Sequence, residues 1–135
     1  MVQEIPYLGA DYQDLKYKEL IEKIINIFYN VYSKLGYGFQ EKVYKDAMII
    51  EFKKEGIPSI SQPGIKVFYK GEIIDEHYTD ILVDNKVLVR IKAEENLLKD
   101  YEEQLSHHIK VTDIEAGLLI NFGTFPGVKL YIDNF

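Results

Sequence analysis

The segment from Ile114 to Phe122 is almost entirely apolar, and it constrains the fold more than any other part of the chain. A strand of this composition is covered on both faces, as in a sheet that lies between two layers. The preceding segment, over about 97–110, places apolar residues at helical spacing from Leu98 to Ile109. A helix that connects two strands of one sheet makes them parallel, so we expect the strand over 87–91 to run parallel to this one.

Two helical segments precede the strands. The first runs from about Tyr12 to Leu35 and carries one broad apolar stripe. The second runs from about Phe39 to Lys54 and ends at Gly56 and Pro58. Its core face is predicted to hold Phe39, Val43, Ala47 and Ile50.

Between the second helix and the third, the apolar pattern changes to a period of two. Strands are predicted over 65–70, 78–83 and 87–91, with tight turns at Lys70-Gly71-Glu72 and Asp84-Asn85-Lys86, as an antiparallel meander. A last, edge strand is expected over 128–132. The order is therefore ααβββαββ, an α/β fold with a mixed sheet between helices. We expect a single domain over residues 1–135, with 1–11 as an N-terminal arm.

Composition narrows the classes of function. The 135-residue chain has a formal net charge of −6, which argues against tight binding of nucleic acid by bulk charge. It has no cysteine, which excludes a disulfide framework, a cysteine-ligated zinc site and a thiol nucleophile. The sequence shows no membrane span and no signal-peptide pattern, so we expect a cytoplasmic protein with no membrane partner.

Three charged residues lie inside otherwise apolar strands. Asp80 precedes Ile81-Leu82-Val83. Arg90 and Lys92 alternate with apolar residues in the segment over 87–92. Residues two apart on a strand share a face, so Arg90 and Lys92 are predicted to point the same way. The short turn at 84–86 then predicts that a carboxylate and two cations meet on one face of the sheet. The alternative is a solvated charged strip at the edge of the sheet.

A set of ordered motifs resembles the GxxExxY family of the PD-(D/E)XK nuclease superfamily. Gly38 to Tyr44 matches the GxxExxY string itself. The resemblance covers about residues 20–132, and its further segments are Tyr69-Lys70-Gly71, Asp80 to Val83, Val89 to Ala93, Gln104-Leu105 and Gly117 to Gly123.

The resemblance implies a restriction-endonuclease-like three-layer fold and a set of site residues. By position, the helix glutamate is Glu41, the strand aspartate is Asp80, the lysine is Lys92 and the supporting glutamine is Gln104. In that family an active member binds a divalent ion, often Mg²⁺, and here Asp80 and Glu41 would be its ligands. The family's remaining carboxylate ligand is replaced by Arg90.

Arg90 changes the charge of the predicted site. Glu41 and Asp80 with Arg90 and Lys92 give a formal charge of zero, so these side chains need no ion for neutrality. A guanidinium beside Asp80 would repel a cation and occupy the carboxylate oxygens. We therefore expect metal-dependent hydrolysis to be lost, unless Glu94 or Glu95 acts as a displaced ligand or Arg90 contacts a phosphate directly.

Three functions follow from these residues. The first is a catalytically impaired domain that binds nucleic acid or a protein; the second is an active Mg²⁺-dependent nuclease. The third is an oligomerisation module, a homodimer through the first helix or through the strand over 128–132. Tyr44 is predicted either to line the pocket or to pack, and His108 and His77 are weaker candidates for the pocket.

Overall fold

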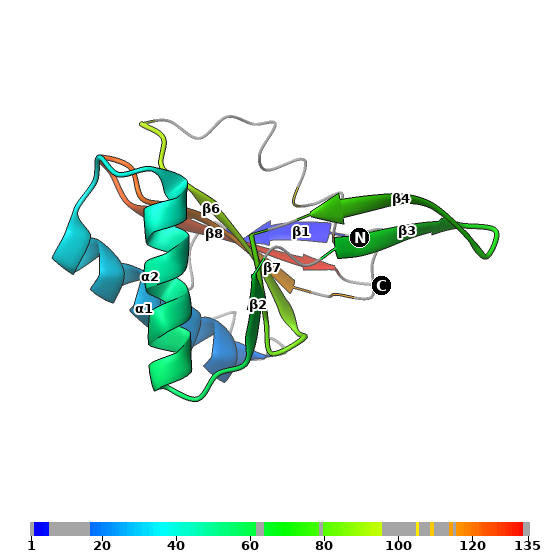
Figure 1. The fold of residues 1–135 in the computed structure, drawn as a ribbon, viewed down its shortest axis with the longest axis horizontal. Helices are drawn as coiled ribbons and strands as arrows, with labels where there is room; N and C mark the ends of the chain where they lie inside the picture. The colour runs from blue at the N-terminus through cyan, green and yellow to red at the C-terminus, as the bar shows by residue number, and fades with distance from the viewer. Residues whose placement is uncertain are drawn as a thin grey trace.

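The computed structural model describes residues 2–5, 17–61, 64–78, 80–95, 105, 109, 114 and 116–133. Six strands form one sheet in the order β1-β8-β7-β6-β5-β2, and β3 and β4 form a separate two-stranded sheet (Figure 1). The elements are β1 (Val2–Ile5), α1 (Lys18–Leu35), α2 (Glu41–Lys54), β2 (Ser59–Ser61), β3 (Gly64–Tyr69), β4 (Glu72–Tyr78), β5 (Ile81–Val83), β6 (Val87–Lys92), β7 (Ala116–Asn121) and β8 (Gly127–Asp133).

The centre of the large sheet is the parallel pair β6 and β7. Their parallel direction was predicted from the helical segment between them, and it is confirmed. Every residue of β7 is buried, as its composition predicts for a strand covered on both faces. The other pairs of this sheet are antiparallel, so the sheet is mixed.

Two apolar clusters lie on opposite faces of this sheet. On one face, α1 and α2 pack against Val87, Val89 and Ile91 of β6. On the other, Leu88 packs with Leu105 and Ile109, which are helical in the segment predicted as the third helix. The predicted three-layer α/β fold is confirmed. In the part of the chain that the structure describes, no helix is both long and apolar enough to cross a membrane.

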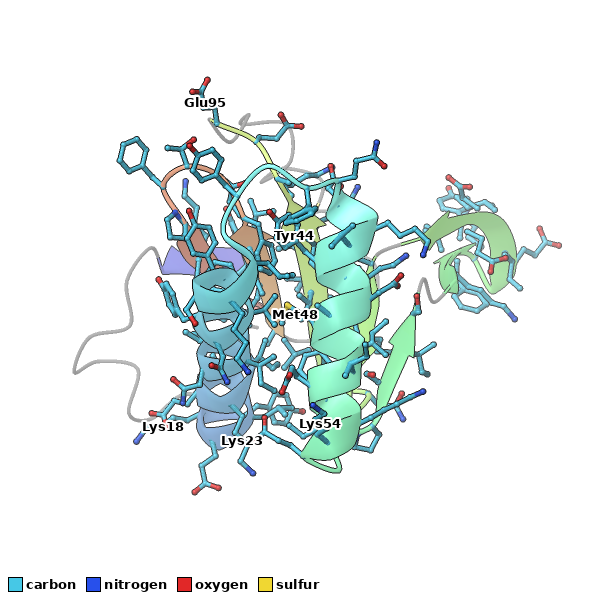
Figure 2. The ribbon with its side chains drawn as sticks, turned by 60° about the vertical axis from the view of Figure 1, so that its left-hand side comes forward. Lys18, Lys23, Tyr44, Met48, Lys54 and Glu95 are labelled. Atoms are coloured by element: carbon cyan, nitrogen blue, oxygen red, sulfur yellow. The ribbon has the colours of Figure 1, made fainter. Side chains whose placement is uncertain are left out.

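The core face of α2 differs from the prediction. Its buried residues are Tyr44, Met48 and Phe52, whereas Val43 and Ile50 are exposed. Figure 2 shows Tyr44 and Met48 on the side of α2 that faces α1. Both sets of residues recur at helical spacing, and the larger side chains turn toward the core because they bury more apolar surface.

The predicted three-stranded meander is interrupted at Asp80. Among the described strands, β3 pairs with β4 alone, whereas β5 pairs with β6 and β2 in the large sheet. The expected strand over 78–83 is therefore divided between two strands: β4 ends at Tyr78, and β5 begins at Ile81. Both predicted tight turns are present, with positive φ at Lys70 and Gly71 and at Asp84 and Asn85.

The C-terminal strand is not an edge strand, contrary to the prediction. β8 lies between β7 and β1, and β1 pairs with it antiparallel. Residues Val2–Ile5, within the segment predicted as an arm, thus belong to the sheet. Over residues 130–132 the backbone of β8 is paired on both sides, so this part of the strand is not available for the dimer that the sequence suggested through residues 128–132.

Candidate functional site

The predicted site residues gather where β6 ends and α2 begins. Glu41 is the first residue of α2, Asp80 precedes β5, and Ile91 and Lys92 are the last residues of β6. A pocket of about 200 Å³ lies there, lined by Glu41, Lys42, Lys45, Asp80 and Ile91. In mixed α/β sheets, ligands bind beyond the carboxyl ends of parallel strands, and this pocket has that position.

Asp80 is held by the backbone of the neighbouring strand. The N–H of Ile91 donates a hydrogen bond to Asp80 Oδ2 at 2.6 Å. In the antiparallel register, Ile81 pairs with Val89, so the carboxylate meets β6 just beyond the last pair of the ladder. The side chain therefore satisfies an N–H at the point where the strand pairing stops.

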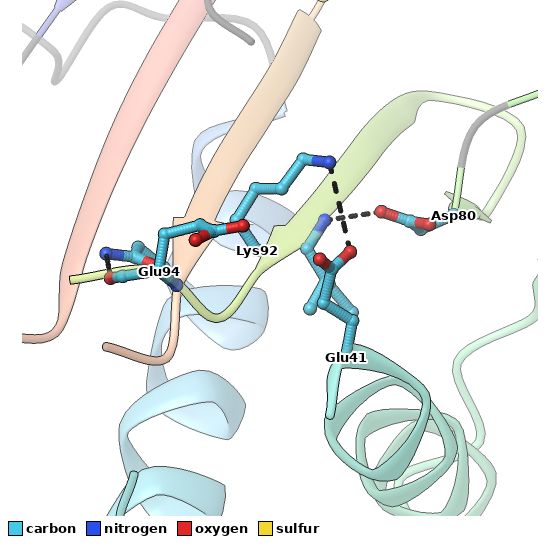
Figure 3. Close-up of polar contacts among 6 residues, drawn as sticks. Glu41, Asp80, Lys92 and Glu94 are labelled. Atoms are coloured by element: carbon cyan, nitrogen blue, oxygen red, sulfur yellow. Dashed lines mark hydrogen bonds and ion pairs between the residues drawn. The ribbon is translucent and has the colours of Figure 1, made fainter. Parts of the chain in front are cut away.

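Glu41 and Lys92, two of the predicted site residues, form an ion pair with each other. Lys92 Nζ lies 3.9 Å from Glu41 Oε1, and Figure 3 shows the ammonium reaching from β6 toward the start of α2. The lysine side chain is 14% exposed and the glutamate 43% exposed. This long, half-solvated contact brings the two together without fixing the carboxylate, since an exposed pair of this kind contributes little energy.

The side chain of Arg90 lies away from the place where the sequence predicted it. It does not line the pocket, and its Nε and Nη1 atoms are buried. Between the described side chains of Arg90 and Asp80 the structure has no ion pair within 4.0 Å. The expectation that the guanidinium occupies the oxygens of Asp80 is therefore wrong, because Asp80 turns to the backbone of Ile91 instead.

The end of β6 is fixed by a buried amide. Asn121 Oδ1 accepts a hydrogen bond from the N–H of Glu94 at 2.9 Å, and Asn121 Nδ2 donates one to the carbonyl of Glu94 at 2.8 Å. Gly123 packs directly against the same carbonyl, where a β-carbon would overlap it. These contacts hold the backbone just after Lys92.

The GxxExxY string of residues 38–44 builds the turn between the two helices. Gly38 has φ +110°, a conformation that favours glycine. The hydroxyl of Tyr44 donates a hydrogen bond to the carbonyl of Gly36 at 2.7 Å and accepts one from the N–H of Phe39 at 3.3 Å. Tyr44 is fully buried, so it packs and does not line the pocket; the glutamate is the string's contribution to the site.

Other predicted residues lie outside the described residues. These are Gln104 and His108, and the same holds for the side chain of His77. Lys42 and Lys45 also line the pocket, and neither was predicted from the sequence to do so. Lys45 is four residues after Glu41, and this spacing on one helix face could have identified it.

Most of the sequence matches a family model. The model describes the PD-(D/E)XK nuclease superfamily, and it covers residues 18–132. The chain belongs to this superfamily. No curated protein and no solved structure gives a significant match.

The charge of the pocket lining disfavours the divalent ion that active members of the superfamily use. Among the described residues, no three histidine or carboxylate side chains gather into a group that could hold a metal, so Glu94 and Glu95 do not join the others. Of the two carboxylates in the pocket, Asp80 already accepts the Ile91 N–H. Two carboxylates and two lysines line the pocket, so its formal charge is zero without an ion. Two carboxylates with water can hold Mg²⁺, so it is the lack of net negative charge in the lining, and not the number of oxygen atoms, that disfavours the ion.

Proposed function

We propose that this domain binds nucleic acid through the pocket at Glu41 and Asp80 and does not hydrolyse it with a metal ion. The observation that carries the proposal is the charge of the pocket lining, which two carboxylates and two lysines bring to zero. A basic residue, Arg90, also stands where the resemblance implies a carboxylate ligand. Both features remove the excess negative charge that would attract a divalent cation.

Lysines supply the phosphate contacts in this proposal. Lys42 and Lys45 line the pocket, and Lys92 lies beside it, 3.9 Å from Glu41. Ammonium groups attract phosphate as point charges and need no fixed geometry. The net charge of −6 for the whole chain keeps this binding weak and local, so it depends strongly on salt.

Within the superfamily, we assign the chain to the GxxExxY type. The contacts of this string in the structure support the assignment. Its glycine has the positive φ that the helix–helix turn needs, its tyrosine bonds the end of α1, and its glutamate reaches the pocket. Each of the three defined positions of the string thus has a separate physical reason.

An active nuclease is the second candidate, and one observation favours it. Glu41, Asp80 and Lys92 do meet at one edge of the sheet, as the resemblance implies for catalysis. An added carboxylate at residue 90 would restore the ligand pattern of the family. The two candidates therefore differ in whether the natural chain cleaves nucleic acid.

A cleavage assay separates them. Single-stranded, duplex and branched DNA are incubated with Mg²⁺ or Mn²⁺ and either the natural chain or Arg90→Glu. We expect no cleavage by the natural chain. Metal-dependent cleavage by it that is abolished in Asp80→Asn would overturn the proposal. Cleavage that appears only in Arg90→Glu would support it and would assign the loss to residue 90.

Binding is measured separately, by fluorescence anisotropy with labelled DNA and RNA over a range of salt concentrations. We expect weak binding at low salt that Lys45→Gln reduces several-fold. Lys53→Gln is the matched control, because Lys53 is an exposed lysine in the last turn of the same helix. Equal effects of the two variants, or no binding at low salt, would exclude the pocket as a nucleic-acid site.

A further inference from the structure

The β3–β4 hairpin, over residues 64–78, is a two-stranded sheet of its own. We call this hairpin the arm; it is distinct from the N-terminal segment 1–11. Figure 1 shows the arm projecting from the large sheet, away from α1 and α2. Its two strands pair with each other and with no other described strand. An isolated two-stranded hairpin is at best marginally stable in water, so a projecting arm of this kind calls for a covering surface.

The arm exposes large apolar side chains. Phe68 and Tyr69 are each 59% exposed, and Ile73 and Ile74 are 54% and 64% exposed. Phe68 and Ile73 are direct cross-strand partners. Lys66 and Phe68 are two apart on β3 and therefore share a face. The register shifts between Val67 and Phe68, so β4 has one extra residue between Glu76, the partner of Lys66, and Ile73. One face thus holds an apolar pair next to a pair of opposite charges.

The charges of the arm are divided between its strands. β3 and the turn carry Lys66 and Lys70, whereas β4 carries Glu72, Asp75 and Glu76. Lys66 and Glu76 are opposite each other, yet the ion pairs among the described residues do not include one between them. Glu76 instead lies over Gly64. Two lysines and three carboxylates make the arm slightly acidic, which disfavours nucleic acid as its partner.

We propose that the arm is a self-association surface that takes the arm of a second copy of this chain. Consider two arms stacked face to face about a two-fold axis parallel to their strands. β3 of each then lies over β4 of the other. Phe68 of each copy faces Ile73 of the other, and Lys66 faces Glu76.

This arrangement makes the surface complementary to itself, as a two-fold interface requires. A two-fold axis perpendicular to the strands would instead place β3, which carries Lys66, over β3 of the second copy, and β4 over β4. Like charges would then face each other. The first arrangement is therefore the one that the charges select. A pair of stacked hairpins buries less than the roughly 1,600 Å² of a standard interface, so we expect a weak dimer with a dissociation constant in the micromolar range or above. The proposal does not depend on the function of the pocket.

Sedimentation equilibrium and light scattering of the full chain over a range of concentrations test self-association. We expect a reversible monomer–dimer equilibrium. Phe68→Ser should weaken it at least about tenfold. Tyr69→Ser is the matched control, because Tyr69 is the next residue of β3, equally exposed and on the opposite face; it should leave the equilibrium unchanged.

Charge reversal tests the pairing. Lys66→Glu alone and Glu76→Lys alone should each weaken the dimer, because like charges then face each other in both symmetric contacts. An equimolar mixture of the two variants should recover the dimer as a heterodimer, as should the double variant Lys66→Glu/Glu76→Lys. Recovery in the mixture would have to come from contacts between two copies. Within its own hairpin, each single variant still has two like charges, at residues 66 and 76.

Several results would overturn the proposal. They are a chain that stays monomeric at every concentration, a dimer weakened equally by Phe68→Ser and Tyr69→Ser, and a mixture that stays monomeric. A monomer that loses nucleic-acid binding in Phe68→Ser would assign the arm to nucleic acid instead. Far-ultraviolet circular dichroism of each variant shows whether the large sheet and helices are intact.

Discussion

The carboxylate of Asp80 accepts a 2.6 Å hydrogen bond from the backbone N–H of Ile91. This bond places a charged side chain at the point where β5 and β6 stop pairing. It also takes up one oxygen of the residue that the family resemblance assigns to metal binding. Asp80 therefore has a structural role here that needs no ion.

Replacing Asp80 separates this structural role from its charge. Asp80→Ala leaves the Ile91 N–H without its acceptor, and we expect the free energy of unfolding to fall by about 1–3 kcal/mol. Asp80→Asn keeps a carbonyl oxygen and should recover most of this loss. Urea denaturation followed by circular dichroism measures both variants.

Asp46→Ala is the control for removing a carboxylate from the same region. Asp46 is exposed and pairs with Lys42 on the surface of α2. Its removal should leave the free energy of unfolding nearly unchanged, as for most surface ion pairs. If Asp80→Ala is equally harmless, the hydrogen bond to Ile91 does not contribute to stability.

The sequence predicted which charged residues lie near one another better than it predicted their contacts. Asp80 and Lys92 were recognisable as charged residues in apolar strands, and both lie at the pocket or beside it. The direction of each side chain was not predictable, because it depends on where the strand pairing ends. Arg90 illustrates this: its position on β6 was predicted, but the burial of its Nε and Nη1 away from the pocket lining was not.

The fold shows the same division between composition and packing. The apolar composition of β7 predicted burial on both faces, and all its residues are buried. Spacing alone allowed two apolar stripes at α2. Of the predicted stripe, Phe39, Val43 and Ile50 are exposed, and Ala47 packs partly against the core. The rotation of the helix is set by contacts with distant residues: Tyr44 stacks on Phe122 with 4.2 Å between ring centroids. Such contacts cannot be read from local periodicity.

Gly123 is predicted to be essential for the turn that follows β7. A β-carbon there would overlap the carbonyl of Glu94, which is backbone and cannot move away easily. We expect Gly123→Ala to lower the free energy of unfolding by about 1–3 kcal/mol through overpacking and to disturb the Asn121–Glu94 hydrogen bonds. Thermal and urea denaturation measure the loss.

Gly127→Ala is the matched control for Gly123→Ala. A β-carbon at Gly127 meets nothing within 4 Å, and its φ is not in the left-handed region. Alanine there should be neutral or stabilise the protein by up to about 1 kcal/mol, because it restricts the unfolded chain. Equal losses from the two substitutions would show that the contact with Glu94 is not the cause.

The hydroxyl of Tyr44 is predicted to stabilise the turn between the helices and to have no part in ligand binding. Tyr44→Phe keeps the ring on Phe122 but removes the hydrogen bonds to Gly36 and Phe39. We expect a loss of about 1–2 kcal/mol in the free energy of unfolding and unchanged nucleic-acid affinity. Tyr29→Phe, at an exposed tyrosine of α1, should cost less than about 0.5 kcal/mol. A loss of affinity without a loss of stability in Tyr44→Phe would return this residue to the pocket.

The Lys42–Asp46 pair predicts a measurable effect of pH. The hydrogen bond from Lys42 at 2.6 Å is the main cause that lowers the pKa of Asp46 below its usual 3.8. Desolvation, the second-largest effect, opposes it, and the charges of Lys42 and then Lys45 lower the pKa further. A lowered pKa in the folded state stabilises the fold above pH 3.8, and this contribution is lost as the pH falls through the folded-state pKa.

Carbon-13 titration of the Asp46 carboxyl should therefore give a pKa below 3.8, and Lys42→Met should move it back toward that value. The stability difference between the natural chain and Lys42→Met should likewise shrink in acid. A pKa for Asp46 that is the same in both proteins would show that the pair does not persist in solution.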